Sequence, residues 1–233
     1  MLANDYFIRT GLEAPSQELA RAQAKLAGFI DLARSKRPPS DPTALYQYRV
    51  PKLSVDGICS LRGALESKPY ELADVLGGRS GATTSRLHTL DALLAQVHQA
   101  LNVDWLGVYQ ARRSKDAALI KLNYRGIPSR AEFPLTAAFA AKSNNSAVAM
   151  SGKARVINDV FAHLSNGGAY YECDPNVQAE ACLPFFEADH VVGIIDAEHS
   201  SKSAFTSERL ALLIAFCLEL PALLPTGGVP VRD

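Results

Sequence analysis

Cys173 is the residue of this chain most suited to covalent chemistry. It lies in a polar stretch, residues 158–175, between Glu172 and Asp174 and just after two tyrosines. A cysteine in a loop can reach solvent and become a thiolate, which is its nucleophilic form. The two flanking carboxylates oppose that ionisation, so a reactive Cys173 needs a compensating donor such as a helix N-terminus. The alternative is a loop thiol without a function.

Two further groups could build a binding pocket. Asp196 and Glu198 alternate along a predicted strand, which places them on the same face of a sheet, and Glu180 lies in a second strand. Two carboxylates on an inward face suppress the ionisation of one, which yields a proton donor beside a cation-binding base. The alternative is a solvated strand end. Trp105 and Tyr109 belong either to the core or to the wall of an apolar pocket.

The other cysteines are interpreted from their surroundings. Cys182 lies in an apolar strand and Cys217 in an apolar helix, where a free cysteine behaves as a small buried hydrophobe. Cys59 lies in a region without a clear pattern. No Cys-x-x-Cys pair and no histidine cluster accompanies them, so we expect no metal site and no cofactor. The scattered histidines give no support to a Cys–His protease.

The composition narrows the class of protein. The 233 residues carry 24 Lys plus Arg against 24 Asp plus Glu, and 48% of them are hydrophobic. That balance excludes a disordered chain and argues against a nucleic-acid partner. No apolar run approaches the roughly 20 residues of a membrane span, and the N-terminus lacks a basic segment followed by an apolar one. We therefore expect a cytoplasmic protein without a membrane partner, whose cysteines are reduced.

An N-terminal extension precedes the regular part of the chain. Apolar residues recur at helical spacing over 16–37, where Ser16 can cap a helix and two prolines end it. We predict that this stripe packs on the domain or on a second copy, and that the protein is a homodimer. Residues 38–83 show no clear pattern, and a glycine-rich stretch marks their end. We therefore divide the chain into an extension, 1–83, and a domain, 84–233.

The domain has an order of elements typical of an α+β layer. Thr84 or Ser85 can cap its first helix. The predicted elements are that helix, strands over 103–111 and 117–124, a helix over 136–151, a short strand over 153–157, strands over 180–187 and 190–199, and a helix over 205–224. Paired neighbouring strands favour an antiparallel sheet with helices packed on one face. The polar loop over 158–175 is long for a compact domain, and such loops are often functional.

Four segments of the domain resemble the GAF domain and, within it, the free methionine-R-sulfoxide reductase family. DWLGVY is similar to that family's Asn-Trp-x-Gly-Phe-Tyr strand, and AVAMSGKARVINDV to its helix-to-strand step. CDPNVQAEACLPFF is similar to Cys-Asp-x-x-Ser-x-x-Glu-x-x-x-Pro-Leu, and VVGIIDAEHSSKSAFTSE to Val-Ile-Gly-Val-Leu-Asp-Ile-Asp-Ser followed by Phe-x-x-Glu. The resemblance runs from about Leu87 to Leu224 and implies a GAF-like antiparallel sheet.

By position, the resemblance implies a reductase of a free, amino-acid-sized substrate, methionine-R-sulfoxide. Cys173, paired with Asp174, would attack the sulfoxide sulfur and become a sulfenic acid. Trp105 and Tyr109 would enclose the methyl and thioether groups. Three acids would bind the ammonium group and protonate or orient the sulfoxide oxygen, in a division that the sequence leaves open: Glu180, Asp196 and Glu198.

Completing the catalytic cycle requires a second thiol. It would condense with the sulfenic acid to a disulfide, which thioredoxin or another thiol reductant would clear. Cys182 and Cys59 are the candidate resolving cysteines. The two upstream cysteines of the family fall in the stretches AEFPL and KSNNSAVAM, which contain none, and Cys182 on a buried strand is poorly placed to reach Cys173.

Two alternatives to the reductase therefore stay open. One is a non-catalytic GAF module that binds or senses a small ligand, and the other is a structural dimerisation domain. We favour the reductase, because a module freed from that chemistry has no need of Cys173.

Overall fold

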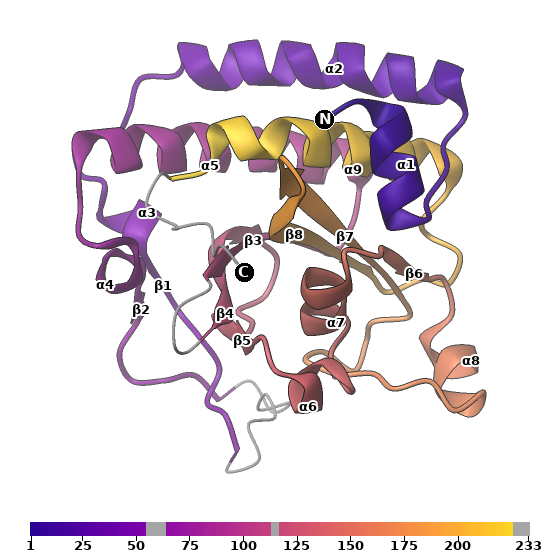
Figure 1. The fold of residues 1–233 in the computed structure, drawn as a ribbon. Coiled ribbons are helices and arrows are strands. Elements are labelled where there is room, and N and C mark those ends of the chain that lie inside the picture. The colour runs from indigo at the N-terminus through magenta and orange to yellow at the C-terminus, as the bar shows by residue number, and fades with distance from the viewer. Residues whose placement is uncertain (55–63, 113–116, 226–233) are drawn as a thin grey trace.

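The computed structural model describes residues 1–54, 64–112 and 117–225 (Figure 1). Cys59 lies outside the described residues. The elements in chain order are α1 (Ala3–Thr10), α2 (Ser16–Ser35), α3 (Thr43–Tyr46), β1 (Gln47–Tyr48), β2 (Tyr70–Glu71), α4 (Leu72–Leu76), α5 (Gly81–Leu101), β3 (Trp105–Arg112), β4 (Ala118–Arg125), β5 (Glu132–Pro134), α6 (Ala137–Ala140), α7 (Asn144–Ser151), β6 (Arg155–Ile157), α8 (Val160–Ser165), β7 (Ala179–Glu187), β8 (His190–His199), α9 (Ser207–Glu219) and the 3-10 turn η1 (Leu220–Leu223).

Six strands form one antiparallel sheet in the order β5-β4-β3-β8-β7-β6. Alternation along β3 separates its two faces. Leu106 and Val108 pack into the larger core, which the long helices cover, whereas Trp105 and Tyr109 pack into a smaller cluster on the opposite face. The predicted α+β class, with an antiparallel sheet and packed helices, is confirmed.

The helices form layers on the sheet. α5 and α9 cover one face, and α2 lies across both of them as an outer layer (Figure 1). The short α7 packs on the opposite face against β7 and β8, which adds a helix to the face that the sequence left uncovered. In the three described stretches, no helix is both long and apolar enough to span a membrane.

The apolar stripe of α2 is buried within its own chain. Its buried residues belong to the same core as those of α5 and α9, and they are Leu19, Ala22, Leu26, Ile30 and Ala33. The apolar stripe of α2, from which we predicted a homodimer, is therefore covered by helices of the same chain. The homodimer stays a prediction.

We expect Leu26→Ala to lower the free energy of unfolding by about 2–5 kcal/mol, because Leu26 is 1% exposed and the substitution leaves a cavity. Leu32→Ala on the same helix is the control. Because Leu32 is 52% exposed, this substitution should change the free energy of unfolding by at most about 0.5 kcal/mol. Chemical denaturation of both variants measures the difference. Equal effects would show that α2 does not pack in this way in solution.

Local details differ from the sequence predictions. Pro15 rather than Ser16 occupies the cap position of α2, and Ser80 caps α5, with its hydroxyl accepting the Thr83 amide at 3.1 Å. Thr84 and Ser85 are therefore inside the helix and not its cap. The polar loop over 158–175 contains α8, whose first turn is capped by the Asp159 carboxylate.

The extension packs closely on the domain. The Tyr6 hydroxyl of α1 donates to the carbonyl of Pro184 in β7 at 2.9 Å. Residues 38–83, which showed no pattern, include the two-stranded β1–β2 ladder, and the Tyr48 hydroxyl of β1 donates to the carbonyl of Lys121 at 2.7 Å. The two parts share one hydrophobic core. The division after residue 83 stays a prediction.

Candidate functional site

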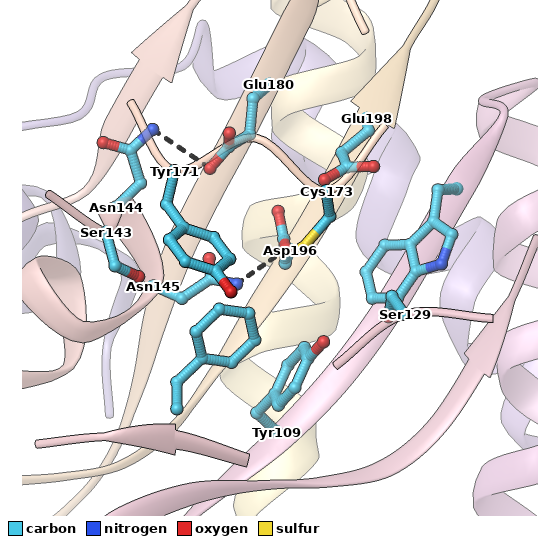
Figure 2. A pocket seen from close by; sticks show the side chains of 12 residues that line it. Tyr109, Ser129, Ser143, Asn144, Asn145, Tyr171, Cys173, Glu180, Asp196 and Glu198 are labelled. Atoms are coloured by element: carbon cyan, nitrogen blue, oxygen red, sulfur yellow. Dashed lines mark hydrogen bonds between the residues drawn. The ribbon is translucent and has the colours of Figure 1, made fainter. Parts of the chain in front are cut away.

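A pocket lies on the face of the sheet that α7 covers (Figure 2). Six of its lining residues were predicted from the sequence: Trp105, Tyr109, Cys173, Glu180, Asp196 and Glu198. Six were not: Ser129, Phe133, Ser143, Asn144, Asn145 and Tyr171. The structure thus brings the predicted thiol, acids and aromatic rings into one pocket.

Strand register assembles the three acids. Asp196 and Glu198 point to the same face of β8, and Glu180 of β7 is paired directly with Glu198. One carboxylate oxygen from each lies within 4.8 Å of the others. Glu180 is 5% exposed and Asp196 only 3%. The interpretation as solvated strand ends is therefore wrong for these two.

Two asparagines at the start of α7 hold the buried acids. The Asn144 side-chain amide donates to Glu180 at 3.1 Å, and that of Asn145 donates to Asp196 at 2.9 Å (Figure 2). Arg155 donates in turn to the Asn144 oxygen at 3.2 Å. The second carboxylate oxygen of Asp196 has no hydrogen-bond partner among the described residues. It is free to accept from a ligand.

Burial changes the acid–base behaviour of this pair. Desolvation, and then the charge of Glu180, raise the pKa of Asp196 well above its ordinary value. Desolvation also raises the pKa of Glu180. Two neighbouring buried carboxyls therefore resist carrying two negative charges, so that one can hold a proton while the other binds a cation. Carboxylate oxygens in this arrangement are also ligands that a hard metal ion accepts.

Cys173 is half-buried in a loop that lines the pocket, and it lies beside Asp196 and Glu198 in Figure 2. The N-terminus of α7 lines the same pocket, and Ser143 caps it by accepting the Ser146 amide at 3.4 Å. The positive end of a helix therefore lines the same pocket as the Cys173 thiol. Tyr171 fastens the loop by accepting from Arg130 at 3.1 Å.

Asp174 does not line the pocket. Its carboxylate accepts the backbone and side-chain amides of Asn176, both at 2.9 Å, and so forms a turn of the loop. Glu172 is exposed. The loop therefore carries the two flanking acids away from the pocket lining. A direct catalytic role for Asp174 stays a prediction.

The other two described cysteines, Cys182 and Cys217, are buried from solvent. Cys182 is fully buried in the cluster beneath the pocket, and burial raises the pKa of its thiol well above the ordinary value. Cys217 lies in α9, where burial raises the pKa of its thiol to about 12. Neither is presented to Cys173 as a reactive thiolate in this conformation. The role of Cys59 as a resolving thiol stays a prediction.

Trp105 and Tyr109 form an aromatic wall, with ring centroids 6.2 Å apart. They are 3% and 1% exposed. The indole of Trp105 covers Gly107, where an added Cβ would lie 2.1 Å from a carbon of the ring. Gly107 therefore makes room for the wall, since a ring cannot occupy the same space as a side chain.

We expect Gly107→Ala to lower the free energy of unfolding by about 1–3 kcal/mol, because the new methyl group must push the Trp105 ring aside. Gly28→Ala is the matched control. Gly28 lies in α2, and a methyl group added there would meet nothing within 4 Å, so the same change should stabilise by up to about 1 kcal/mol. Denaturation curves compare the two. A Gly107→Ala protein as stable as the parent would contradict the placement of the ring.

The sequence contained a signal for some of the missed residues. Ser143, Asn144 and Asn145 form a polar run immediately before the apolar residues of α7, which is typical of a helix N-terminus. Phe133 lies in β5 and Ser129 in the loop before it, in a region that the sequence left without an element. Their place in the pocket depends on how the chain between β4 and β5 folds back.

Comparisons with known proteins agree with this architecture. A family model described as the GAF domain matches residues 85–220, more than half of the chain. The solved type II free methionine-R-sulfoxide reductase of Thermoplasma acidophilum is similar with a TM-score of 0.53 and 19% identity, over 61% of this chain and 94% of that one. A protein named as a GAF sensor from Burkholderia vietnamiensis is similar with a TM-score of 0.51 and 18% identity, over 85% of this chain and 90% of that one. Among curated proteins, none matches at a significant level.

Proposed function

Since this chain belongs to the GAF domain family, we propose that its pocket binds a free amino acid and reduces methionine-R-sulfoxide with Cys173 as the nucleophile. The observation that carries the proposal is the pocket itself, in which one thiol lies with three acids and an aromatic wall. The similar structure from Thermoplasma acidophilum is named for this reaction.

The lining supports recognition of such a molecule. The cluster of Glu180, Asp196 and Glu198 suits an ammonium group, because it offers closely spaced oxygens in a buried place. The wall of Trp105 and Tyr109 suits a thioether and its methyl group, which gain by leaving water. A free amino acid with a sulfur-containing side chain satisfies both parts.

The reaction uses the shared proton of the acid pair. The Cys173 thiolate attacks the sulfoxide sulfur while a protonated carboxyl of Asp196 or Glu180 donates to the departing oxygen. A sulfur–sulfur bond to Cys173 forms as the sulfur–oxygen bond breaks, and the protonated oxygen leaves as hydroxide. That hydroxide attacks the Cys173 sulfur and breaks the new sulfur–sulfur bond, which releases methionine and leaves Cys173 as a sulfenic acid. A second thiol then condenses with it, releasing water, and a third reduces the mixed disulfide. One sulfoxide and two thiols give methionine, water and one disulfide.

Unless Cys59 resolves Cys173, turnover depends on an external thiol. Within the described residues, Cys182 and Cys217 are both buried, and so neither is placed to condense with Cys173 without a rearrangement. Thioredoxin or a small dithiol is the reductant that we expect.

The test is a methionine assay with each sulfoxide epimer in the presence of dithiothreitol. We expect methionine from free methionine-R-sulfoxide and a much smaller yield from the S epimer, because a pocket of fixed geometry presents only one sulfur configuration to the thiol. Equal yields from the two epimers, or no methionine from either, would refute the reductase.

A GAF sensory module is the second candidate. It is favoured by the burial of the other described thiols, and the similar structure from Burkholderia vietnamiensis is named as a sensor. A ligand that raises the melting temperature without being consumed would favour this candidate over the reductase.

A further inference from the structure

Lys121 is a buried cation that the proposed reaction does not use. Its residue is 0% exposed, in the middle of β4. The ammonium donates to the carbonyl oxygen of Ser129 at 2.7 Å and to its hydroxyl at 2.9 Å. Moving a charge from water into the protein interior costs free energy unless hydrogen bonds or other charges compensate it. A buried lysine in this place therefore suggests a specific role.

Aromatic rings surround the same ammonium. Its nitrogen lies 4.1 Å from the ring centroid of Tyr124, 5.0 Å from that of Tyr48 and 5.9 Å from that of Trp105. Rings at these distances stabilise a desolvated cation. Tyr48 comes from β1 of the extension, where it also stacks on Tyr70 of β2. The extension therefore supplies part of this cage.

Lys121 holds the loop over residues 126–131, which joins β4 to β5. Four carbonyls of this loop are bonded to the sheet: Trp105 Nε1 donates to Ile127 at 3.0 Å, Lys121 Nζ to Ser129 at 2.7 Å, Tyr109 Oη to Arg130 at 3.4 Å and the Lys121 backbone amide to Ala131 at 2.8 Å. Ser129 lines the pocket, and two of the donors are its aromatic wall. The loop and the aromatic wall thus hold each other in position through these hydrogen bonds.

We propose that Lys121 is a positioning residue of the pocket, held by a cage that the N-terminal extension completes. It sets the place of Ser129 and of the Trp105 ring, and through them the shape that the ligand meets. The extension therefore contributes to the shape of the pocket by helping to hold Lys121. The effect on catalysis rests on the proposed function, whereas the effect on the loop does not.

The first experiment needs no ligand, because Trp105 is the only tryptophan of the chain and reports directly on the loop. Lys121→Met keeps the length of the side chain and removes its charge. We expect the lifetime-corrected acrylamide quenching constant of Trp105 to rise about twofold or more, since the loop loses two of its bonds. Tyr48→Phe, which keeps the ring and removes only its hydroxyl, should give a smaller rise.

Tyr46→Phe is the matched control. Tyr46 is a buried tyrosine of the extension, whereas Tyr48 is partly buried. The Tyr46 hydroxyl bonds to Thr84 at 2.9 Å, away from the loop. It should change stability as much as Tyr48→Phe does and leave the quenching constant unchanged. An unchanged constant in Lys121→Met would overturn the proposal, whether or not the protein reduces sulfoxides.

The second experiment measures steady-state kinetics with methionine-R-sulfoxide. We expect Lys121→Met to raise KM about tenfold or more, with a smaller change in kcat, because the ligand meets a loosened wall while Cys173 and the acids stay in place. A quenching change with an unaltered KM would refute the positioning role. A parent protein without any turnover would refute the reductase and leave the quenching result to decide on Lys121.

Discussion

Replacing Cys173 with serine is expected to lower methionine formation by at least about 10³-fold, because the hydroxyl cannot replace a thiolate as the nucleophile toward sulfur. Ligand binding should survive, since Cys173 contributes one side of a pocket whose acids and aromatic wall are unchanged. Single-turnover assays with the R epimer measure the first effect, and a thermal shift with methionine measures the second.

Cys217→Ala is the control for this substitution. Cys217 lies in α9 on the far side of the sheet and is 1% exposed, so its loss should lower the melting temperature modestly and preserve turnover. If Cys173→Ser kept most of the parent activity, another residue would have to be the nucleophile. If both substitutions abolished activity, folding rather than chemistry would explain the loss.

Asp196→Asn is expected to separate binding from stability. An ammonium ligand loses its charged partner, so the affinity should fall about 10- to 100-fold. The ligand-free protein, in contrast, should be stabilised by on the order of 1 kcal/mol at neutral pH, because asparagine removes a carboxyl that ionises more easily in the unfolded chain than in its buried place beside Glu180. Calorimetry of binding and denaturation of the free protein measure the two effects.

The raised pKa of Asp196 also makes the stability of the protein depend on pH. Below the ordinary carboxyl pKa, near 4, both the folded and the unfolded chain hold the proton, so Asp196 contributes nothing to the difference. Above it the unfolded chain releases the proton more easily, because the pKa of Asp196 is raised in the fold. The free energy of unfolding therefore falls as the pH rises from about 4 until the raised pKa is passed.

Asp31→Asn is the control for that profile, since Asp31 is exposed on α2. The difference in stability between the parent and Asp196→Asn should widen with rising pH, whereas the difference for Asp31→Asn should stay small. A parallel profile for Asp196→Asn would mean that the carboxyl is not buried as described.

The sequence predicted the components of the site better than their positioning. Alternation along a strand was enough to place Asp196 and Glu198 on one face, because the period of two is a property of any strand. Their pairing with Glu180 follows from the β7–β8 hairpin, which a short turn between apolar runs already indicated. Local sequence patterns were therefore enough to predict the shared face of the acids and the pairing of these strands.

The missing parts depended on contacts between distant segments. Asn145 reaches Asp196 across 51 positions, and Tyr48 reaches Lys121 across 73, which no local pattern reveals. The sequence gives Lys121 the pattern of an ordinary strand lysine, because two of the rings around it, those of Tyr48 and Trp105, come from other segments of the chain. Residues 38–83 showed no pattern for the same reason, since their short β1–β2 ladder packs on the domain through contacts between distant segments.

The most direct test of the proposed function is mass spectrometry of Cys173 after one turnover without reductant. The protein is mixed with methionine-R-sulfoxide and a sulfenic-acid trap, digested and analysed, with the S epimer as the control. With the R epimer, we expect trapped sulfenic acid at Cys173 in proportion to the methionine released. A Cys173 that remains an unmodified thiol while methionine is formed, or that is oxidised equally by both epimers, would contradict it.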